Sequence, residues 1–545
     1  MAEREFPARP NLEQYKKQAK ELARDCAAGV HEAWMRVVRH HPRFADLAPE
    51  ALRGRRAALA DAQLVIAREH GFESWPKFAA QITTLNLERA VSQIDDPVQA
   101  FIRAACVPRE NSHASGTLEE AEMILARYPD VARAIVHTAA IRADEAGVRQ
   151  FLARDAGSAT AKGGPYEWDA LTHLCFSRYL RLDKSRSDAF VSTARALLEA
   201  GASANTGWYE MIDYPNPRPV LESAIYGAAG IAHHEGLTRL LLEYGADPND
   251  EETPYHGAEE YDLGAVRALL ESGRLDETSM TTLLLRKGDW HDREGLRLLL
   301  EHGADPNLMT RWGASALHHA LKRDNAIENV TLLLNHGAKP ALKDREGRSS
   351  TAIAAHRGRG DVLRLLTERG IDWELEGADR LIAACATAND AAIHELTTNE
   401  PELVNLLLAQ GGQVLVEFAG NGNTEGVKRL LDIGVPSDAL FREGDGYWDL
   451  ARNSTALHSA AWRAAPSTVR LLIERGAPVL ARDGKGRTAL ALAVKACVDS
   501  YWKWRRTPEC VEALLNAGAT IDGIEIPCGY DEVDELLLGT KNLGI

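Results

Sequence analysis

The chain has 545 residues, of which 45% are hydrophobic and 26% are charged, so its composition is that of a globular protein with more than one hydrophobic core. Its formal net charge is −16, and residues 1–96 are nearly neutral with 15 Lys and Arg against 14 Asp and Glu, so the acidity lies in the rest of the chain. A surface of this sign repels phosphate backbones, and no apolar run approaches the roughly 20 residues of a membrane span, so we expect neither nucleic acid nor membrane as a partner.

The first 96 residues predict a small helical domain. Residues 11–28 form an amphipathic pattern, residues 31–41 a second helix that ends at Pro42, and residues 55–70 a third that ends at Gly71. A last helix is expected to begin after Ser74, whose hydroxyl can cap it. The charged N-terminus is not followed by the apolar stretch of a secretory signal, so we expect a cytoplasmic protein.

One phrase recurs through the rest of the chain: two leucines, two variable residues, then Gly and usually Ala. Its glycines are Gly201, Gly245, Gly273, Gly303, Gly337, Gly370, Gly434, Gly476 and Gly518. The steps between them are 28–44 residues with one of 64, so several lie near a period of about 33 and one near two periods. The leucines give a helix its apolar edge, and a glycine just past the last turn can adopt the left-handed conformation that ends the helix.

A second sequence signal lies eight to fourteen residues after the leucine-glycine phrase and predicts the start of another helix. Ser315, Thr455 and Thr488 each precede an Ala-Leu pair, and their hydroxyls can cap a helix. Together the two signals resemble the ankyrin repeat, whose T-P-L-H-x-A signature they follow with Ala in place of Pro. Within this resemblance His318, His458 and His173 occupy the slot whose imidazole bonds the backbone of the hairpin.

The resemblance implies an all-α fold: an ankyrin-repeat solenoid preceded by a small helical domain. Each repeat would hold two antiparallel helices and a projecting hairpin, and neighbours would bury one another's leucine faces. We expect an N-terminal helical domain at residues 1–96 and an array with insertions at residues 97–545, closed by a capping helix at residues 531–538. The N-terminal helices resemble a short module found ahead of ankyrin arrays in bacterial proteins, where capping or docking of a partner are the alternatives.

Aromatic and arginine side chains in inserted segments are the candidate partner-binding residues, because they bring a large contact area at a small entropic cost. Packing over a long loop is the alternative explanation for each of them. The candidates are Trp208, Tyr209, Glu210, Asp213, Trp290, His291, Asp292, Arg311, Trp312, Trp448, Trp462, Arg463 and Trp502.

No recognised motif for catalysis, cofactor or metal binding emerges from the sequence. Seven cysteines occur without a C-x-x-C pair or a histidine at zinc spacing, so we expect buried free thiols and assign no metal ligand, cofactor or catalytic residue. Among the 18 histidines only His291, flanked by Asp289 and Asp292, forms a cluster of interest.

Three functions are compatible with these patterns, and a scaffold that binds another protein through the concave face and hairpin loops is the one we favour. A receptor for a small molecule or peptide would need one enclosed pocket lined by the aromatic inserts. An enzyme would need acidic groups such as Glu210, Asp213 and Asp289 in a dry cleft.

Overall fold

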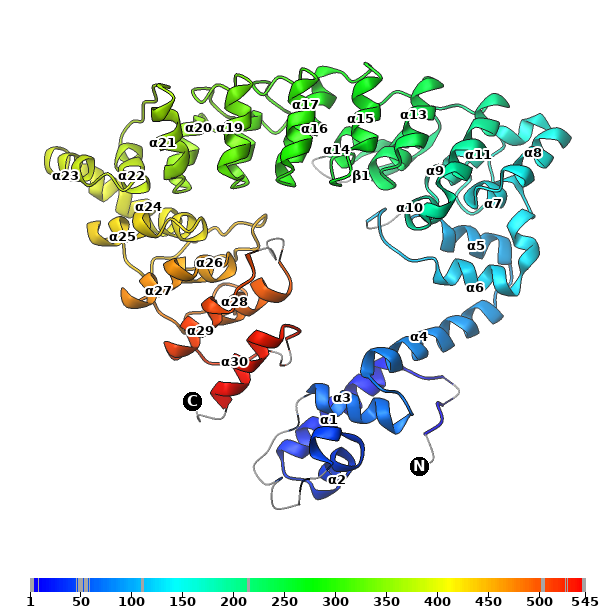
Figure 1. Ribbon diagram of the computed structural model, residues 1–545, viewed down its shortest axis with the longest axis horizontal. Coiled ribbons are helices and arrows are strands. Elements are labelled where there is room, and N and C mark those ends of the chain that lie inside the picture. The colour runs from blue at the N-terminus through cyan, green and yellow to red at the C-terminus, as the bar shows by residue number, and fades with distance from the viewer. Residues whose placement is uncertain are drawn as a thin grey trace. The chain divides into compact units, whose positions relative to one another are not determined.

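A computed structural model of the chain describes residues 4–7, 9–45, 47, 52, 57, 59–108, 112–212, 216–500, 505–524, 526 and 528–541. Backbone contacts divide the chain after Thr83 and again after Glu346. We therefore describe residues up to 83, residues 84–346 and residues 347–545 one after the other (Figure 1).

Four helices begin in the N-terminal segment, with α1 and α2 both packed on α3 and the last helix continuing beyond residue 83. They are α1 (Leu12–Ala27), α2 (His31–His40), α3 (Leu59–Glu69) and α4 (Trp75–Ser92), with a 3-10 turn η1 at Pro42–Phe44. The apolar side of α1 is buried through Tyr15, Ala19, Leu22 and Cys26, as the amphipathic pattern predicted. Asn11 caps this helix, and its side-chain oxygen accepts from the backbone N–H of Glu13 at 2.9 Å. The helices therefore form a core of their own.

Residues 84–346 repeat pairs of helices that lie side by side (Figure 1). The helices are α5 (Pro97–Ala105), α6 (Glu119–Arg127), α7 (Val136–Ile141), α8 (Glu145–Arg154), α9 (Ala170–Cys175), α10 (Arg178–Leu182), α11 (Ser187–Glu199), α12 (Ala224–Tyr226), α13 (Glu235–Glu243), α14 (Glu252–His256), α15 (Gly264–Glu271), α16 (Glu277–Asp289), α17 (Arg293–Glu301), α18 (Ala316–Lys322) and α19 (Ile327–Asn335). Short turns lie between some of them: η3 (Pro129–Arg133), η4 (Ala156–Ala159), η5 (Lys184–Arg186) and the π-turn η6 (Gly227–Ile231).

The recurring leucine-glycine phrase ends one helix of each pair as predicted. All nine of its glycines have positive φ, between 63° and 115°. At the end of α11, Gly201 has φ of 99° and the N–H of Ala202 donates to the carbonyl of Leu197 at 3.0 Å. This Schellman arrangement satisfies a carbonyl that the helix leaves unpaired. Leu197 is fully buried, and so are its counterparts Leu241, Leu269, Leu299 and Leu333.

One sheet interrupts the helices of residues 84–346. Its strands β1 (Gly207–Ile212) and β2 (Arg218–Ser223) pair antiparallel, with Trp208 opposite Glu222 and Glu210 opposite Val220. The fold is thus mostly helical, as expected, but the insertion that carries Trp208 is a β-hairpin.

Residues 347–545 repeat the same construction. The helices are α20 (Ser350–His356), α21 (Gly360–Glu368), α22 (Ala378–Ala386), α23 (Asp390–Asn399), α24 (Glu402–Gly420), α25 (Thr424–Ile433), α26 (Ala456–Trp462), α27 (Pro466–Glu474), α28 (Ala489–Val498), α29 (Glu509–Asn516) and α30 (Asp531–Lys541). The 64-residue step between glycines holds two helix pairs, α22 with α23 and α24 with α25, so it does correspond to two repeats. The last helix, α30, contains the predicted residues 531–538.

Helix α24 departs from the expectation that no apolar run is long enough to cross a membrane. By length and composition its 19 residues would suffice, although half of its most apolar stretch is buried within the structure. Gly412 of this helix lies against the backbone of Leu440, where an added Cβ would come within 2.3 Å of the carbonyl oxygen. The helix therefore has the close packing of a core element.

All seven cysteines are free thiols, as predicted. Six are buried and Cys528 is half-buried. Burial raises the pKa of the Cys510 thiol to about 12, so this sulfur is a poor nucleophile at neutral pH.

Candidate binding site

The β1–β2 hairpin presents two faces of opposite character, because successive side chains of a strand alternate between the faces of a sheet. Trp208 and Glu222 share the inner face and are 5% and 2% exposed. Tyr209 and Met211 lie on the outer face and are 65% and 61% exposed. The two faces of the hairpin thus serve different purposes.

The ring of Trp208 fixes the hairpin to the helices before it. It stacks on Trp168 with the ring centroids 5.3 Å apart, and it meets Phe176 edge-to-face at 5.9 Å. Trp168 is itself 3% exposed, so this stack is part of the core of residues 84–346. The structure therefore places the Trp208 ring where it anchors the hairpin, which is the packing alternative considered from the sequence.

Glu210 and Glu222 converge on His113 beside this stack. Nε2 of His113 lies 3.1 Å from Glu210, and its Nδ1 lies 3.8 Å from Glu222 and 2.9 Å from the hydroxyl of Tyr226. Burial, reinforced by the negative charges of Glu252 and Glu210, raises the pKa of Glu222 to about 8. Burial also lowers the pKa of His113, although the charge of Glu210 opposes it.

His113 is held by the turn that contains it, residues 112–118. Arg181 donates to the carbonyls of Ser115 and Gly116 at 3.4 and 3.3 Å. Arg178 binds the carbonyl of Thr117 at 3.5 Å and that of Ala104 at 2.6 Å. Gly116 has φ of 92°, and an added Cβ there would lie 2.5 Å from the Arg178 guanidinium. Two arginines from α10 thus position the turn that carries the imidazole.

A cleft of about 630 Å³ opens on the other side of the hairpin. Tyr209 and Leu221 line it from the hairpin, while Asp247 and Glu251 line it from the turn that follows α13. Glu251 accepts from Arg218 and, at 2.6 Å, from Arg311. The cleft therefore combines an exposed aromatic ring with a charged rim.

Arg311 and Trp312 lie next to this rim. The guanidinium of Arg311 lies 4.8 Å from the ring centroid of Trp312. The side chain of Trp312 is 42% exposed, and its ring centroid lies 6.1 Å from that of Tyr255. The structure thus links Arg311 with the hairpin residues through Glu251, although about 100 residues separate them in sequence.

A row of charged side chains continues along the helices that follow the hairpin. His256 of α14 lies 3.1 Å from Glu252 and 3.0 Å from Glu259. Asp289 of α16 accepts from His319 at 2.6 Å and from Arg323 at 2.7 Å. Burial opposes ionisation of Asp289, but the hydrogen bond from His319 and the positive charge of Arg323 hold its pKa well below the usual range. Asp289 is therefore an ionised partner of His319 and Arg323.

The turn from α16 to α17 contains three more of the candidates. Trp290 is 38% exposed and meets Tyr261 edge-to-face at 6.2 Å, and His291 adopts a positive φ of 53°. Asp292 caps α17 through the N–H of Gly295 at 2.9 Å and binds the buried Lys287 at 2.8 Å. Asp292 thus has a structural role, and the exposed ring of Trp290 remains the candidate contact of this turn.

The remaining candidates in the described residues belong to residues 347–545. Trp448, Trp462 and Arg463 are 6%, 3% and 5% exposed. Nε1 of Trp462 donates to the carbonyl of Trp448 at 2.6 Å, and the Arg463 guanidinium lies 4.0 Å from the Trp448 ring centroid. These side chains close the loop before α26 over its helix pair, which leaves little of their surface for a partner. Asp213 and Trp502 lie outside the described residues.

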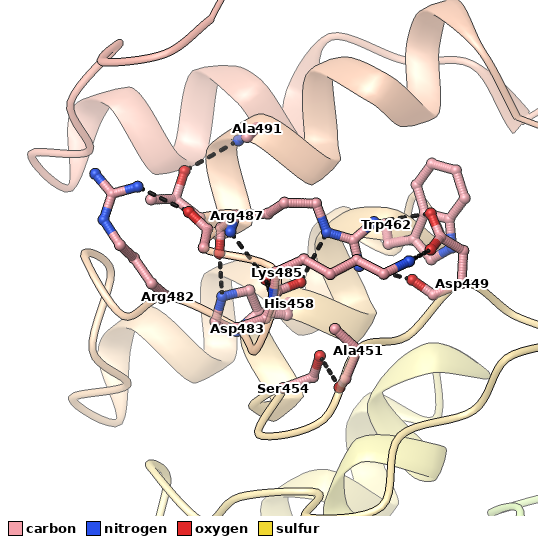
Figure 2. Close-up of polar contacts among 12 residues, drawn as sticks. Asp449, Ala451, Ser454, His458, Trp462, Arg482, Asp483, Lys485, Arg487 and Ala491 are labelled. Carbon is pink, nitrogen blue, oxygen red and sulfur yellow. Dashed lines mark hydrogen bonds and ion pairs between the residues drawn. The ribbon is translucent and has the colours of Figure 1, made fainter.

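Figure 2 shows the charged side of this loop. Asp449 accepts from Lys485 at 2.6 Å and from Arg487 at 2.7 Å, and the ring of Trp462 lies beside them. Arg487 also donates to Asp483 at 2.8 Å. The ion pairs join the loop to the next hairpin turn.

The signature histidines bind the backbone as the resemblance implied. Nε2 of His318 lies 2.9 Å from the carbonyl oxygen of Leu342, and Nε2 of His458 lies 3.2 Å from those of Ala481 and Arg487. His173 differs, because its Nδ1 bonds the carbonyl of Asp169 within its own turn at 2.9 Å.

Sequence reasoning missed His113, Glu222, Tyr226 and His256. The signal was weak because His113 precedes Glu210 by about 100 residues and lies in a turn without repeat character. Alternation of Trp208, Glu210, Val220 and Glu222 could have indicated a shared strand face once a hairpin was considered.

Residues 287–376 and 415–524 match the family described as ankyrin repeats (3 copies). The chain is 36% identical over 100 residues to the B-cell lymphoma 3 protein of Homo sapiens and 38% identical over 84 residues to serine/threonine-protein kinase 12 of Arabidopsis thaliana. These matches cover 18% and 15% of this chain and 18% and 16% of the two proteins, so the chain spans less than a fifth of each relative. Residues 287–376 and 415–524 are therefore shown to be ankyrin repeats.

Proposed function

We propose that the protein is a scaffold that binds a partner protein at the outer face of the β1–β2 hairpin and in the cleft beside it. Ankyrin repeats in general are protein-binding scaffolds. The exposure of Tyr209 and Met211 on a hairpin anchored by Trp208 is the observation that carries the proposal. Aromatic and Met side chains held rigidly at the surface lose little entropy on binding, which is typical of binding hot spots.

The charged rim defines the chemistry of the partner. Arg218 and Arg311 share the carboxylate of Glu251, and Asp247 and Asp250 also line the cleft. A protein segment that places an apolar side chain against Tyr209 and Met211, with polar groups at the rim, fits this surface. A small molecule or peptide is the second candidate, because the cleft volume of about 630 Å³ lies within the range of ligand pockets.

The test uses the full chain with a photo-crosslinking residue at position 209. We expect it to crosslink one partner in native extract, and the double change Tyr209→Ser with Met211→Ser to weaken binding of that purified partner about 30-fold or more. The control is Leu480→Ser, which changes an apolar side chain of similar exposure, 57%, outside the hairpin and the cleft. Equal affinity of the double variant and the control for the partner would contradict the proposal.

We also propose a role and a location for the protein. The N-terminal helices have their own core and serve as the helical module that precedes ankyrin arrays in bacterial proteins. Six buried thiols without a disulfide are typical of a reducing compartment, which supports a cytoplasmic location.

A further inference from the structure

We propose that His113, Glu210 and Glu222 bind one divalent transition-metal ion of zinc-like preference. One ligand atom from each of these side chains lies within 4.8 Å of the others. The site uses the inner face of the hairpin, whereas the proposed partner surface uses the outer face. The two proposals therefore rest on different side chains.

The spacing of the imidazole and the first carboxylate already fits a shared ion. Nε2 of His113 and the carboxylate oxygen of Glu210 are 3.1 Å apart. Bonds of about 2.0–2.1 Å from a tetrahedral zinc place neighbouring ligand atoms roughly 3.3 Å apart. The observed distance therefore leaves room for a cation that both atoms contact.

Glu222 supplies the independent sign that something is bound. Its side chain is 3% exposed, and its Oε2 is buried without a hydrogen-bond partner among the described residues. Trp208 lies opposite it and Glu210 is its diagonal neighbour on the same face of the sheet. Two carboxylates so placed repel one another when both are ionised, and burying a carboxylate oxygen without a partner leaves its desolvation uncompensated. A cation between the two carboxylates would remove both costs.

Tyr226 completes the site as an outer partner of the imidazole. Its hydroxyl lies 2.9 Å from Nδ1 of His113, and the residue is 3% exposed. In the tautomer whose Nδ1–H donates a hydrogen bond to this hydroxyl, the lone pair of Nε2 points toward Glu210 and is free to bind a metal. Metal-bound histidines commonly donate a hydrogen bond from their second ring N–H in this way, which fixes the orientation of the ring and its tautomer.

The donor set selects the class of metal. One imidazole nitrogen and two carboxylates suit zinc and its transition-metal neighbours, whereas calcium and magnesium prefer sites made wholly of oxygen. Three protein ligands leave a coordination position open, and Glu210, 28% exposed, is the ligand nearest to solvent. The ion would tie the turn at residues 112–118 to a hairpin about 100 residues later in the chain.

The test measures Zn²⁺ affinity of the full chain after removal of metals, by competition with a chromophoric chelator. We expect each parent chain to bind one Zn²⁺ ion tightly. The Zn²⁺ affinity should fall at least about 100-fold in Glu222→Gln and His113→Gln, and about 10-fold to 100-fold in Tyr226→Phe. With Co²⁺ as the probe, the visible absorption of low-coordinate cobalt should appear in the parent and disappear in Glu222→Gln.

The matched control is Glu252→Gln, which removes the same charge close to the site but changes no proposed ligand. It should keep the affinity of the parent within a few-fold. Circular dichroism establishes that each variant is folded, and Glu210→Gln replaces Glu222→Gln if the latter is not. Absence of a tight equivalent, or affinity unchanged in both ligand variants, would overturn the metal site without affecting the test at Tyr209 and Met211.

Discussion

Two inserted segments carry aromatic residues, and they use them differently. The β1–β2 hairpin buries Trp208 and exposes Tyr209, because neighbouring residues of a strand point to opposite faces. The loop before α26 buries Trp448 against Arg463, and Trp462 donates to its backbone. An aromatic residue in an insertion therefore indicates a binding surface only where the local backbone turns it toward solvent.

The largest effect should come from removing the buried ring in either segment. We expect Trp208→Ala and Trp462→Ala each to lower the free energy of unfolding by about 3–5 kcal/mol, because each leaves a cavity among fully packed neighbours. Urea denaturation followed by circular dichroism measures the change. Trp312→Ala, at a ring that is 42% exposed, is the control and should cost less than about 1 kcal/mol.

A small effect of Trp208→Ala beside a large effect of Trp462→Ala would contradict this view of the hairpin. Its ring would then not be the anchor that holds Tyr209 and Met211 in place.

The repeat could be predicted from sequence because its signals are local. A glycine such as Gly201 ends its helix in the left-handed region wherever it occurs, and the leucine before it faces the neighbouring repeat. The hairpin could not be predicted in the same way, since its strands are 6 residues each and resemble a loop rich in aromatic and proline residues.

The candidate site was predicted only in part. Tyr209, Glu210 and Arg311 were found because aromatic, acidic and arginine side chains stand out in an insertion. His113 joins Glu210 only through the folded structure, and no local pattern reports a contact over such a separation. Trp448 and Trp462 had the same sequence signal as Trp290 and Trp312, but the first two are buried and the last two are exposed, so residue type alone could not distinguish burial from exposure.

The two regions should also respond in opposite directions to pH. Burial would lower the pKa of His256, but the hydrogen bonds that its charged ring donates to Glu252 and Glu259 outweigh burial and raise the pKa from 6.5 to about 9. The charged His256 ring therefore adds its full contribution to the free energy of unfolding below about pH 6.5, and this contribution is lost as the pH rises through 9. Asp449 near the other loop has a lowered pKa, since Lys485 and Arg487 outweigh its burial. Its effect is present above about pH 4 and is lost on acidification.

Free energies of unfolding at a series of pH values test this contrast. Relative to the parent, we expect His256→Gln to lose about 1–3 kcal/mol at pH 6 and much less at pH 10. Asp449→Asn should lose less than about 1 kcal/mol at pH 7, because its carboxylate is 34% exposed, and nothing at pH 2. A His256→Gln deficit that grew with pH would show that His256 is not held in its charged form.

The smallest effect should come from the residue next to the anchor. Tyr209→Ala removes a ring that is 65% exposed, so we expect the free energy of unfolding to change by less than about 0.5 kcal/mol. The same urea denaturation that compares Trp208→Ala with its parent measures it. A loss of 2 kcal/mol or more, on the order of a buried side chain, would mean that Tyr209 packs against the protein. Because one peptide bond joins the two residues, only the alternation of side chains across the strand can account for a large effect at Trp208 and almost none at Tyr209.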